Sequence, residues 1–249
     1  MKARKFKVNR QNLSISGRVY GDCSGVSPLV ILSHGFMANQ SMCKKYAKLL
    51  ARKGYVAVTF DFCGGGLFSS SEGKTYDMSV LTEADDLEAV IDYFIEEPYV
   101  DKSRISLLGC SQGGFVSAIV AKRRYNMINR LIMFYPALCI PDDARKGSMV
   151  FAKFDPKNIP DKIRCGPMII GKGYVTSVIN SDAYSLIGDF SGKVLLVHGT
   201  KDKLVDISYS RKAIEKFSNL EFHEIEGAGH GFKGVYDEQA KEILTAFME

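Results

Sequence analysis

The sequence of 249 residues contains no tryptophan, only four histidines and only seven prolines. It also has no uninterrupted apolar run long enough for a membrane-spanning helix, which needs about 18 residues or more. The basic N-terminus is not followed by the apolar segment of a secretory signal peptide. The remaining composition, 46% hydrophobic and 24% charged, is ordinary for a globular protein. These features exclude a disordered or collagen-like chain and predict a cytoplasmic protein without membrane contact.

Six cysteines are scattered along the chain without a C-x-x-C pair and without a Cys/His spacing suited to zinc. We therefore expect free thiols in a reducing compartment. The three consecutive glycines at 64–66 do not fit a phosphate-binding motif, and they predict a tight turn after a strand. The sequence thus predicts neither a metal site nor a cofactor.

The net charge of +5 comes mostly from local basic clusters, at residues 1–10 and 122–124. A nucleic-acid-binding protein typically shows a basic face interleaved with aromatic residues and a recognisable binding module. Neither pattern occurs here, so we expect no nucleic-acid partner and interpret the clusters as solvated surface. The sequence does not determine the oligomeric state, and a homodimer stays open.

Apolar runs alternate with segments of helical periodicity along most of the chain. The expected strands cover about 4–9, 12–20, 28–34, 55–60, 104–109, 130–135, 193–198 and 220–225. The expected helices cover about 42–53, 80–96, 112–124 and 206–217, with a last one from about 236. Five acidic residues between 83 and 92 are expected mostly off the buried face of their helix. This alternation predicts an α/β fold with a mostly parallel sheet of about eight strands flanked by helices.

Proline is concentrated in one part of the chain. Five of the seven prolines fall between Pro136 and Pro167, and regular periodicity fades until about residue 190. We interpret 136–190 as a small cap inserted into a core formed by 1–135 and 191–249.

The segment Gly109-Cys110-Ser111-Gln112-Gly113 has the form G-x-S-x-G and lies directly between an expected buried strand and a helix. This is the position of a nucleophile elbow, a sharp turn that exposes the serine at the end of a strand. The flanking glycines avoid side-chain clashes between strand and helix. We therefore predict that Ser111 is a catalytic nucleophile. Cys110 is expected to point away from the site, which argues against a cysteine nucleophile.

A serine nucleophile needs a base, and elimination among the four histidines favours His230. His34 and His198 end strands before a glycine, which suits packing, and His223 lies within a strand, where we expect it at the surface. His230 follows the last strand, as the chain order Ser–Asp–His requires. We favour Asp202, which follows the preceding strand, as the acid that orients it. Asp206 is the rival, although a helix N-cap would also explain it.

An oxyanion hole needs two donors placed in advance of the reaction. The backbone N–H groups of Gln112, after the nucleophile, and of Phe36, in the loop after the strand 28–34, are the expected pair. Gly35 would let the backbone approach the substrate closely.

These motifs, taken in order, resemble the α/β-hydrolase superfamily over nearly the whole chain. They are the His34-Gly35 loop, the elbow, His198-Gly-Thr-Lys-Asp202 and Gly227-Ala-Gly-His-Gly-Phe232. Within that superfamily the chain is similar to bacterial feruloyl (cinnamoyl) esterases, most specifically in the segment from Tyr135 to Pro160. The resemblance implies that the cap contacts the phenolic end of a hydroxycinnamate. It also implies that Asp143 and Tyr174 hydrogen-bond the phenolic hydroxyl.

The sequence therefore predicts a serine carboxylesterase that hydrolyses aryl-acyl esters, small molecules of the feruloyl type, through an acyl-enzyme. Other reactions stay open: action on short or medium aliphatic esters, thioesters or lysophospholipids. An aminopeptidase or acyl-peptide hydrolase is a further alternative, although such enzymes usually carry an additional large domain. A non-enzymatic binding protein on the same scaffold is disfavoured because all three members of the triad are present.

Overall fold

The computed structural model describes residues 3–249, and an eight-stranded sheet forms its centre. The spatial order of the strands is β1-β2-β4-β3-β5-β6-β11-β12. Their bounds are β1 (Arg4–Arg10), β2 (Leu13–Tyr20), β3 (Ser27–Ser33), β4 (Val56–Phe60), β5 (Val100–Cys110), β6 (Ile128–Phe134), β11 (Lys193–Gly199) and β12 (Leu220–Ile225). β2 pairs antiparallel with β1 and β4, and all other neighbours in this sheet are parallel. The predicted mostly parallel sheet is confirmed.

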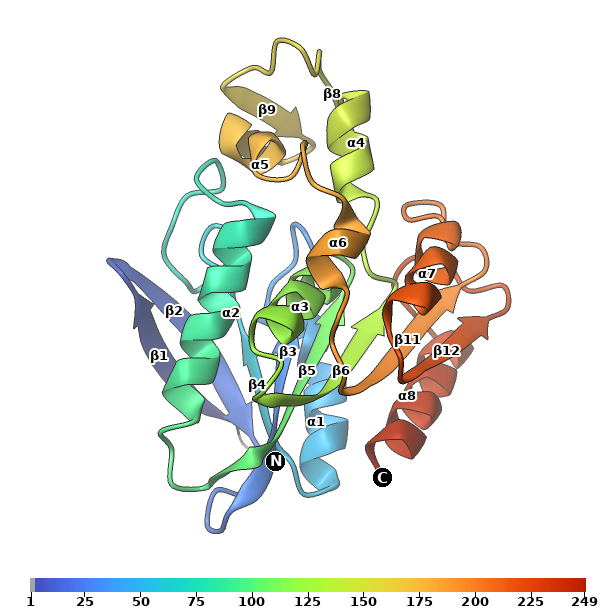
Figure 1. Cartoon of the computed structure of the whole chain (residues 1–249). Helices are drawn as coiled ribbons and strands as arrows, with labels where there is room; N and C mark the ends of the chain where they lie inside the picture. Colours follow the sequence, from blue (N-terminus) through green and yellow to red (C-terminus); the bar gives the residue numbers. More distant parts are fainter. Residues whose placement is uncertain (1–2) are drawn as a thin grey trace.

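Helices cover both faces of the sheet, with α2 and α3 on one side and α1 and α8 on the other (Figure 1). Their bounds are α1 (Lys44–Arg52), α2 (Val80–Phe94), α3 (Gln112–Arg123), α7 (Ser208–Ala213) and α8 (Val235–Met248). Two of the predicted helices include a 3-10 turn. The turn η1 (Gln40–Cys43) precedes α1, and η2 (Ile214–Lys216) ends the segment that begins with α7.

Strand β3 shows how the sheet separates two cores. Leu29 and Ile31 belong to the cluster under α2 and α3, whereas Val30 and Leu32 pack with α1 and α8. All four side chains are fully buried. Successive side chains of a strand point to opposite faces, so a parallel strand covered on both faces reads as one apolar run. Burial of each such side chain contributes about 1.5–3 kcal/mol to stability.

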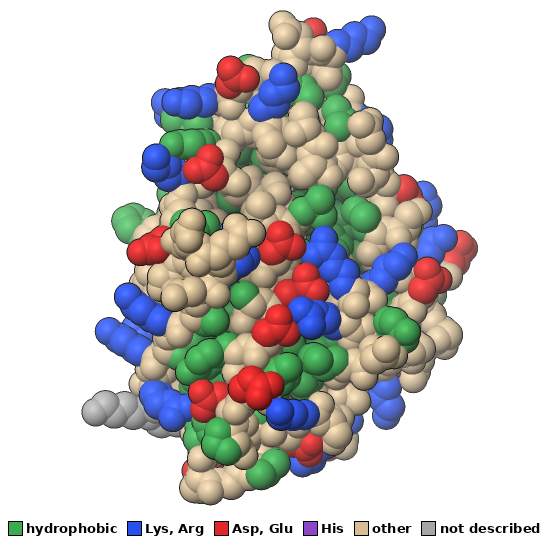
Figure 2. Space-filling view, turned by 60° about the vertical axis from the view of Figure 1, so that its left-hand side comes forward, with side chains coloured by type: hydrophobic (Ala, Val, Ile, Leu, Met, Phe, Trp, Pro, Cys, Tyr) green, Lys and Arg blue, Asp and Glu red, His purple; other side chains and the backbone are tan. Residues whose placement is uncertain are grey.

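Helix α2 begins at a capping box and presents an acidic stripe to α3. The Ser79 hydroxyl accepts from the Thr82 N–H at 3.2 Å, and the Thr82 hydroxyl accepts from the Ser79 N–H at 2.8 Å. Farther along the helix, Glu88 accepts from Arg123, the last residue of α3, and from Arg124, which follows it. The basic cluster at 122–124 is thus partly paired with acids of α2. On the face shown in Figure 2, Lys and Arg lie interspersed with Asp and Glu.

Three of the five acidic residues of α2 lie off its buried face, as expected, but Glu83 and Asp86 do not. Glu83 is 1% exposed and Asp86 is fully buried. The side chain of Asp86 pairs with Arg10 of β1 and accepts from the Cys63 N–H at 2.8 Å. Glu83 lies three residues after Val80 and four before Leu87, so helical spacing itself places it on the buried stripe.

The segment 136–190 contains three short helices and two small hairpins. They are α4 (Ile140–Lys146), β7 (Ser148–Met149), β8 (Ala152–Lys153), β9 (Lys162–Cys165), β10 (Met168–Gly171), α5 (Lys172–Thr176) and α6 (Ala183–Ile187). Figure 1 shows α4, α5, β8 and β9 projecting above the sheet, whereas α6 lies beside α3. Lys122 of α3 donates to the Ser185 carbonyl at 2.7 Å. The end of this segment therefore packs on the body of the fold, and its division from the core at 136 and 190 stays a prediction.

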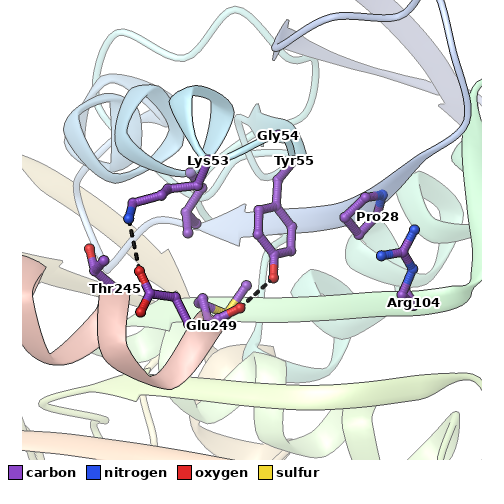
Figure 3. Close-up of a pocket in the computed structure, with 9 residues that line it drawn as sticks. Pro28, Lys53, Gly54, Tyr55, Arg104, Thr245 and Glu249 are labelled. Carbon is purple, nitrogen blue, oxygen red and sulfur yellow. Dashed lines mark hydrogen bonds and ion pairs between the residues drawn. The ribbon is translucent and has the colours of Figure 1, made fainter.

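The end of α8 packs at the edge of the sheet formed by the amino ends of the parallel strands. This edge lies opposite the one formed by their carboxyl ends. Tyr55 donates its hydroxyl proton to the Met248 carbonyl at 2.8 Å, and Lys53 pairs with Glu249 at 2.9 Å (Figure 3). A cavity of about 290 Å³ lies there. Within residues 3–249, no helix has the length and the apolar character needed to cross a membrane.

Candidate active site

Ser111 occupies a sharp turn between the last residue of β5 and the first residue of α3. Its backbone has φ 55° and ψ −121°, a conformation that L-residues rarely adopt. A Cβ added at Gly109 would lie 2.1 Å from the Gly113 carbonyl oxygen, and one at Gly113 would lie 2.4 Å from the His34 carbonyl oxygen. Both motif glycines are therefore required by close backbone contacts. The strained turn places the serine at the start of α3.

We expect Gly113→Ala to lower the free energy of unfolding by about 3 kcal/mol or more, because backbone carbonyls cannot move aside for the new methyl group. Gly173→Ala is the matched control, since a Cβ there would meet no atom within 4 Å. The control should stay within about 1 kcal/mol of the unchanged protein. Urea unfolding followed by circular dichroism measures both. Equal stability of the two variants would contradict this account of the elbow.

The structure brings Ser111, His230 and Asp202 together from three separate loops. His230 Nε2 lies 3.0 Å from Ser111 Oγ, and His230 Nδ1 lies 2.7 Å from Asp202 Oδ2. The Tyr135 ring packs edge-on against the imidazole, with ring centroids 4.8 Å apart. This is the geometry in which a base can take the serine proton while a carboxylate holds the opposite ring nitrogen.

Asp202 is fixed by donors on both carboxylate oxygens. Its Oδ1 accepts from the backbone N–H groups of Leu204 at 2.9 Å and Val205 at 3.0 Å. Burial alone would raise the pKa of Asp202. Hydrogen bonds from His198, His230 and the Val205 N–H outweigh burial and lower that pKa well below its usual range. The side chain is therefore an anion at neutral pH.

The rival acid Asp206 lies outside this arrangement. It is exposed, and its carboxylate accepts from the Ser208 N–H at 2.8 Å at the start of α7. The N-cap of α7 is Ile207, one residue later, so Asp206 is not the predicted N-cap, but this local bond gives it a structural role. Of the two candidates, only Asp202 contacts His230.

The two expected oxyanion donors flank the nucleophile. Among the described residues, neither the Phe36 N–H nor the Gln112 N–H donates to another protein atom. A Cβ at Gly35 would lie 3.1 Å from the Ser111 Cβ, so a larger residue there would crowd the nucleophile itself. His34 supports this loop from beneath, since its Nε2 accepts from the Phe62 N–H at 3.1 Å.

A cavity of about 500 Å³ opens over Ser111 between the sheet and the segment above it. Seven of the eight predicted site residues line it, and the eighth, Asp202, lies behind His230. The seven are Gly35, Phe36, Ser111, Gln112, Asp143, Tyr174 and His230. A cavity of this size holds a small organic molecule. Within residues 3–249, no group of three or more His, Cys, Asp and Glu side chains could hold a metal ion.

Asp143 and Tyr174 reach the cavity from the segment above the sheet. Burial raises the pKa of Asp143 although the Cys139 thiol donates to it. Tyr174 is 2% exposed, and its hydroxyl donates to Gln112 Oε1 rather than standing free. The tyrosine proton is thus engaged within the protein, and only its oxygen is left to accept a bond from a ligand.

A family model describes residues 41–249 as a member of the prolyl oligopeptidase family. The chain belongs to that family. This span holds the elbow, the histidine loop and the orienting aspartate. The fold is the α/β-hydrolase fold, as the sheet order and the solved structures below show.

Among solved structures, Est1E from Butyrivibrio proteoclasticus with bound ferulic acid superimposes with a TM-score of 0.90 at 25% identity. The match covers 98% of this chain and 97% of Est1E. The α/β hydrolase GrgF from Penicillium sp. sh18 has a TM-score of 0.79 at 16% identity, over 100% of this chain and 98% of its own. The latter likeness shows the fold alone.

Among curated proteins, the Escherichia coli protein YcjY, described as uncharacterized, is 31% identical over 127 residues. That match covers 48% of this chain and 41% of YcjY. An Escherichia coli 31.7 kDa protein of the traX-finO intergenic region, also described as uncharacterized, is 31% identical over 88 residues, or 35% of this chain and 30% of its own. The chain therefore matches less than half the length of these curated relatives.

In this member of the prolyl oligopeptidase family, Asp202 contacts a second histidine that the sequence reasoning assigned to packing alone. His198 Nε2 lies 3.1 Å from Asp202 Oδ2 and 3.0 Å from the Val205 carbonyl, while its Nδ1 lies 2.6 Å from the Ser210 hydroxyl. A carbonyl can only accept, so Nε2 carries a proton that it donates to the Val205 carbonyl and toward Asp202. The sequence signal for this contact was the spacing of four residues between His198, near the end of β11, and Asp202 in the loop after it.

The other predictions about histidine and cysteine agree with the structure. His34 is buried and His223 is partly exposed, with 42% of its side chain accessible. Cys110 is 1% exposed and packs in the core between the sheet and the α1 and α8 helices, away from the cavity. All six cysteines are free.

Proposed function

We propose that the protein is a serine hydrolase that cleaves aryl-acyl esters, with hydroxycinnamates as the substrate class, through an acyl-enzyme. The observation that carries the proposal is the continuous hydrogen-bonded chain from Asp202 through His230 to Ser111, which ends in a cavity large enough for such an ester. Donors, base and nucleophile all lie on loops that follow strands of the sheet.

In the first half of the reaction, His230 Nε2 takes the Ser111 proton as Oγ attacks the acyl carbon. The N–H groups of Phe36 and Gln112 stabilise the oxyanion, and Asp202 stabilises the imidazolium. When the tetrahedral intermediate collapses, the imidazolium gives its proton to the leaving alcohol. Water, activated by the same imidazole, then attacks the acyl-enzyme and releases the acid and free Ser111.

The aryl-acyl preference rests on the upper part of the cavity. Asp143 and Tyr174 supply polar oxygens there, and Phe36 and Met149 supply apolar surface. The likeness to Est1E, whose structure contains ferulic acid, supports the same substrate class. We propose that Asp143 accepts a hydrogen bond from the phenolic hydroxyl. Because its own proton is bonded to Gln112, Tyr174 offers only its oxygen, as a second acceptor of the same single phenolic proton.

Peptide hydrolysis is the second candidate, favoured by membership of the prolyl oligopeptidase family. The same triad and oxyanion donors would serve an amide, whose nitrogen His230 would protonate as it leaves. Aliphatic esters, thioesters and lysophospholipids fit the apolar part of the cavity and are the remaining alternatives.

A substrate panel with a constant leaving group separates these activities. We expect kcat/KM for p-nitrophenyl ferulate to exceed that for p-nitrophenyl octanoate at least about tenfold, because each well-placed polar contact contributes about 1.5 kcal/mol or more when it involves a charged group. Aminoacyl p-nitroanilides should be cleaved far more slowly than any ester. Release of p-nitrophenol or p-nitroaniline measures all three.

A preference for acetate or octanoate over ferulate by a wide margin would exclude the aryl-acyl proposal. Faster turnover of an anilide than of every ester would favour peptide hydrolysis instead. Labelling of Ser111 by a fluorophosphonate probe is expected in either case, and its absence would indicate a binding protein. The cytoplasmic location and the choice between monomer and homodimer stay predictions from the sequence.

A further inference from the structure

The side chain of Gln112, next to the nucleophile, is buried and held at both ends. Its Nε2 donates to Glu83 Oε2 of α2 at 2.7 Å, and its Oε1 accepts the hydroxyl proton of Tyr174 of α5. Gln112 is 1% exposed, so water does not compete for these bonds. Among the described residues, the side chains of Glu83, Gln112 and Tyr174 form no hydrogen bond with the side chains of the triad. The proposed mechanism does not use Glu83.

Glu83 lies in a site that has no countercharge. It is 1% exposed, and among the described residues its Oε1 has no hydrogen-bond partner. Burial raises the pKa of Glu83 well above its usual range, because desolvation outweighs the bond from Gln112. Burial of this kind favours the neutral form of the carboxyl group, which then acts through its hydrogen bond to Gln112.

The glycine turn after β4 is shaped around this carboxyl group. A Cβ at Gly65 would lie 2.6 Å from Glu83 Oε1 and 2.5 Å from the Phe62 Cβ. Gly64 has φ +68°, and a Cβ there would meet the Lys74 carbonyl oxygen at 2.4 Å. The turn therefore leaves room for Glu83 beneath the cavity.

Tyr174 connects both expected oxyanion residues to the segment above the sheet. Its hydroxyl bonds the Gln112 side chain, and its ring packs on Phe36 with centroids 5.8 Å apart. The backbone N–H groups of these same two residues are the expected oxyanion donors. A network that fixes their side chains also restricts the directions of their N–H groups.

We propose that Glu83 is a positioning residue, which fixes the oxyanion-hole residue Gln112 through its side-chain hydrogen bond in concert with Tyr174. Its effect passes through Gln112, and it touches neither substrate nor the reacting atoms. The inference rests on the proposed serine hydrolase function. It adds a residue of α2 to the site. It also implies that the position of α5, which carries Tyr174, affects the geometry of the oxyanion hole.

The test compares Glu83→Gln with Glu83→Leu. Glutamine keeps an oxygen facing Gln112 without charge, so kcat for p-nitrophenyl acetate should stay within about twofold. Leucine removes the acceptor, and kcat should fall about tenfold with KM nearly unchanged, a smaller loss than that of a whole oxyanion donor. The rate of phosphonylation by a fluorophosphonate, which also develops charge in the hole, should fall in parallel.

Glu88→Leu is the matched control, because it makes the same change on the same helix at a surface carboxylate paired with Arg124. It should leave kcat unchanged. Thermal unfolding of each variant separates a loss of fold from a loss of positioning. If Glu83→Leu is unstable, Tyr174→Phe, which removes the other bond to Gln112, provides a second measurement and should also lower the phosphonylation rate.

Unchanged kcat in folded Glu83→Leu would overturn the proposal. A loss in Glu83→Gln as large as that in Glu83→Leu would overturn it as well, since it would show that the carboxyl group itself is needed. Neither result bears on the proposed serine hydrolase activity, which is excluded if Ser111 is neither labelled by the fluorophosphonate nor required for turnover.

Discussion

Replacing Ser111 by alanine is expected to lower kcat for p-nitrophenyl acetate by about 10⁴-fold or more and to abolish labelling by a fluorophosphonate. The hydroxyl is the group that His230 Nε2 faces at 3.0 Å, and within residues 3–249 no other hydroxyl or thiol group forms a hydrogen bond with that nitrogen. Serine, histidine and aspartate of a triad act as a unit, so loss of the nucleophile removes nearly all of their joint contribution. Purified Ser111→Ala with unchanged esterase activity would exclude the assignment.

The strained backbone of Ser111 gives this experiment an internal control. Alanine at φ 55° retains the strain, whereas glycine adopts such angles at little cost. We expect Ser111→Gly to be inactive but more stable to unfolding than Ser111→Ala by about 1 kcal/mol. This order of stabilities would show that the turn stores strain at the nucleophile. The reverse order would show that it does not.

The second large effect is expected from Asp202→Asn, which should lower kcat about 10⁴-fold. The amide can present its N–H₂ group to His230 Nδ1, which favours the tautomer with the proton on Nε2. That proton blocks the nitrogen that must accept from Ser111. In Asp202 the carboxylate is an acceptor only, and its lowered pKa keeps it so at neutral pH. Steady-state kinetics at pH 7 to 9 measure the loss.

Asp206→Asn is the matched control for this variant, because it makes the same change four residues away. Asparagine can still accept from the Ser208 N–H, so both helix α7 and kcat should be retained. Loss of activity in Asp206→Asn together with retained activity in Asp202→Asn would reverse the assignment of the orienting acid.

Local sequence chemistry was sufficient to predict the elbow and His230, and it favoured Asp202 without excluding Asp206. The turn at Ser111 needs small residues on both sides, so the G-x-S-x-G spacing identifies it directly. The other members of a triad lie in short loops after strands, so their order along the sequence is informative as well. Asp202 and Asp206 could not be separated in the same way, because each follows a strand and precedes a helix. Only the distance to His230 distinguishes them.

The buried polar contacts depended on tertiary structure. Glu83 lies at a helical spacing from Val80 and Leu87, yet a glutamate is almost never buried without a partner, and its partner Gln112 is 29 residues away. Asp202 also contacts His198, four residues earlier, because the loop after β11 folds back toward the end of that strand. Such pairings depend on where two elements meet, and no local pattern encodes that.

By itself, the sequence determined the order of strands and helices, the mostly parallel sheet and the position of the nucleophile. Each of these follows from hydrophobic periodicity or turn chemistry within a few residues. The tertiary structure decided which acid serves His230, where the proton of Tyr174 goes, and that Glu83 lies beneath the oxyanion residues. These depend on contacts between segments far apart in the chain, whose geometry is fixed only when the sheet, α2 and α5 pack together.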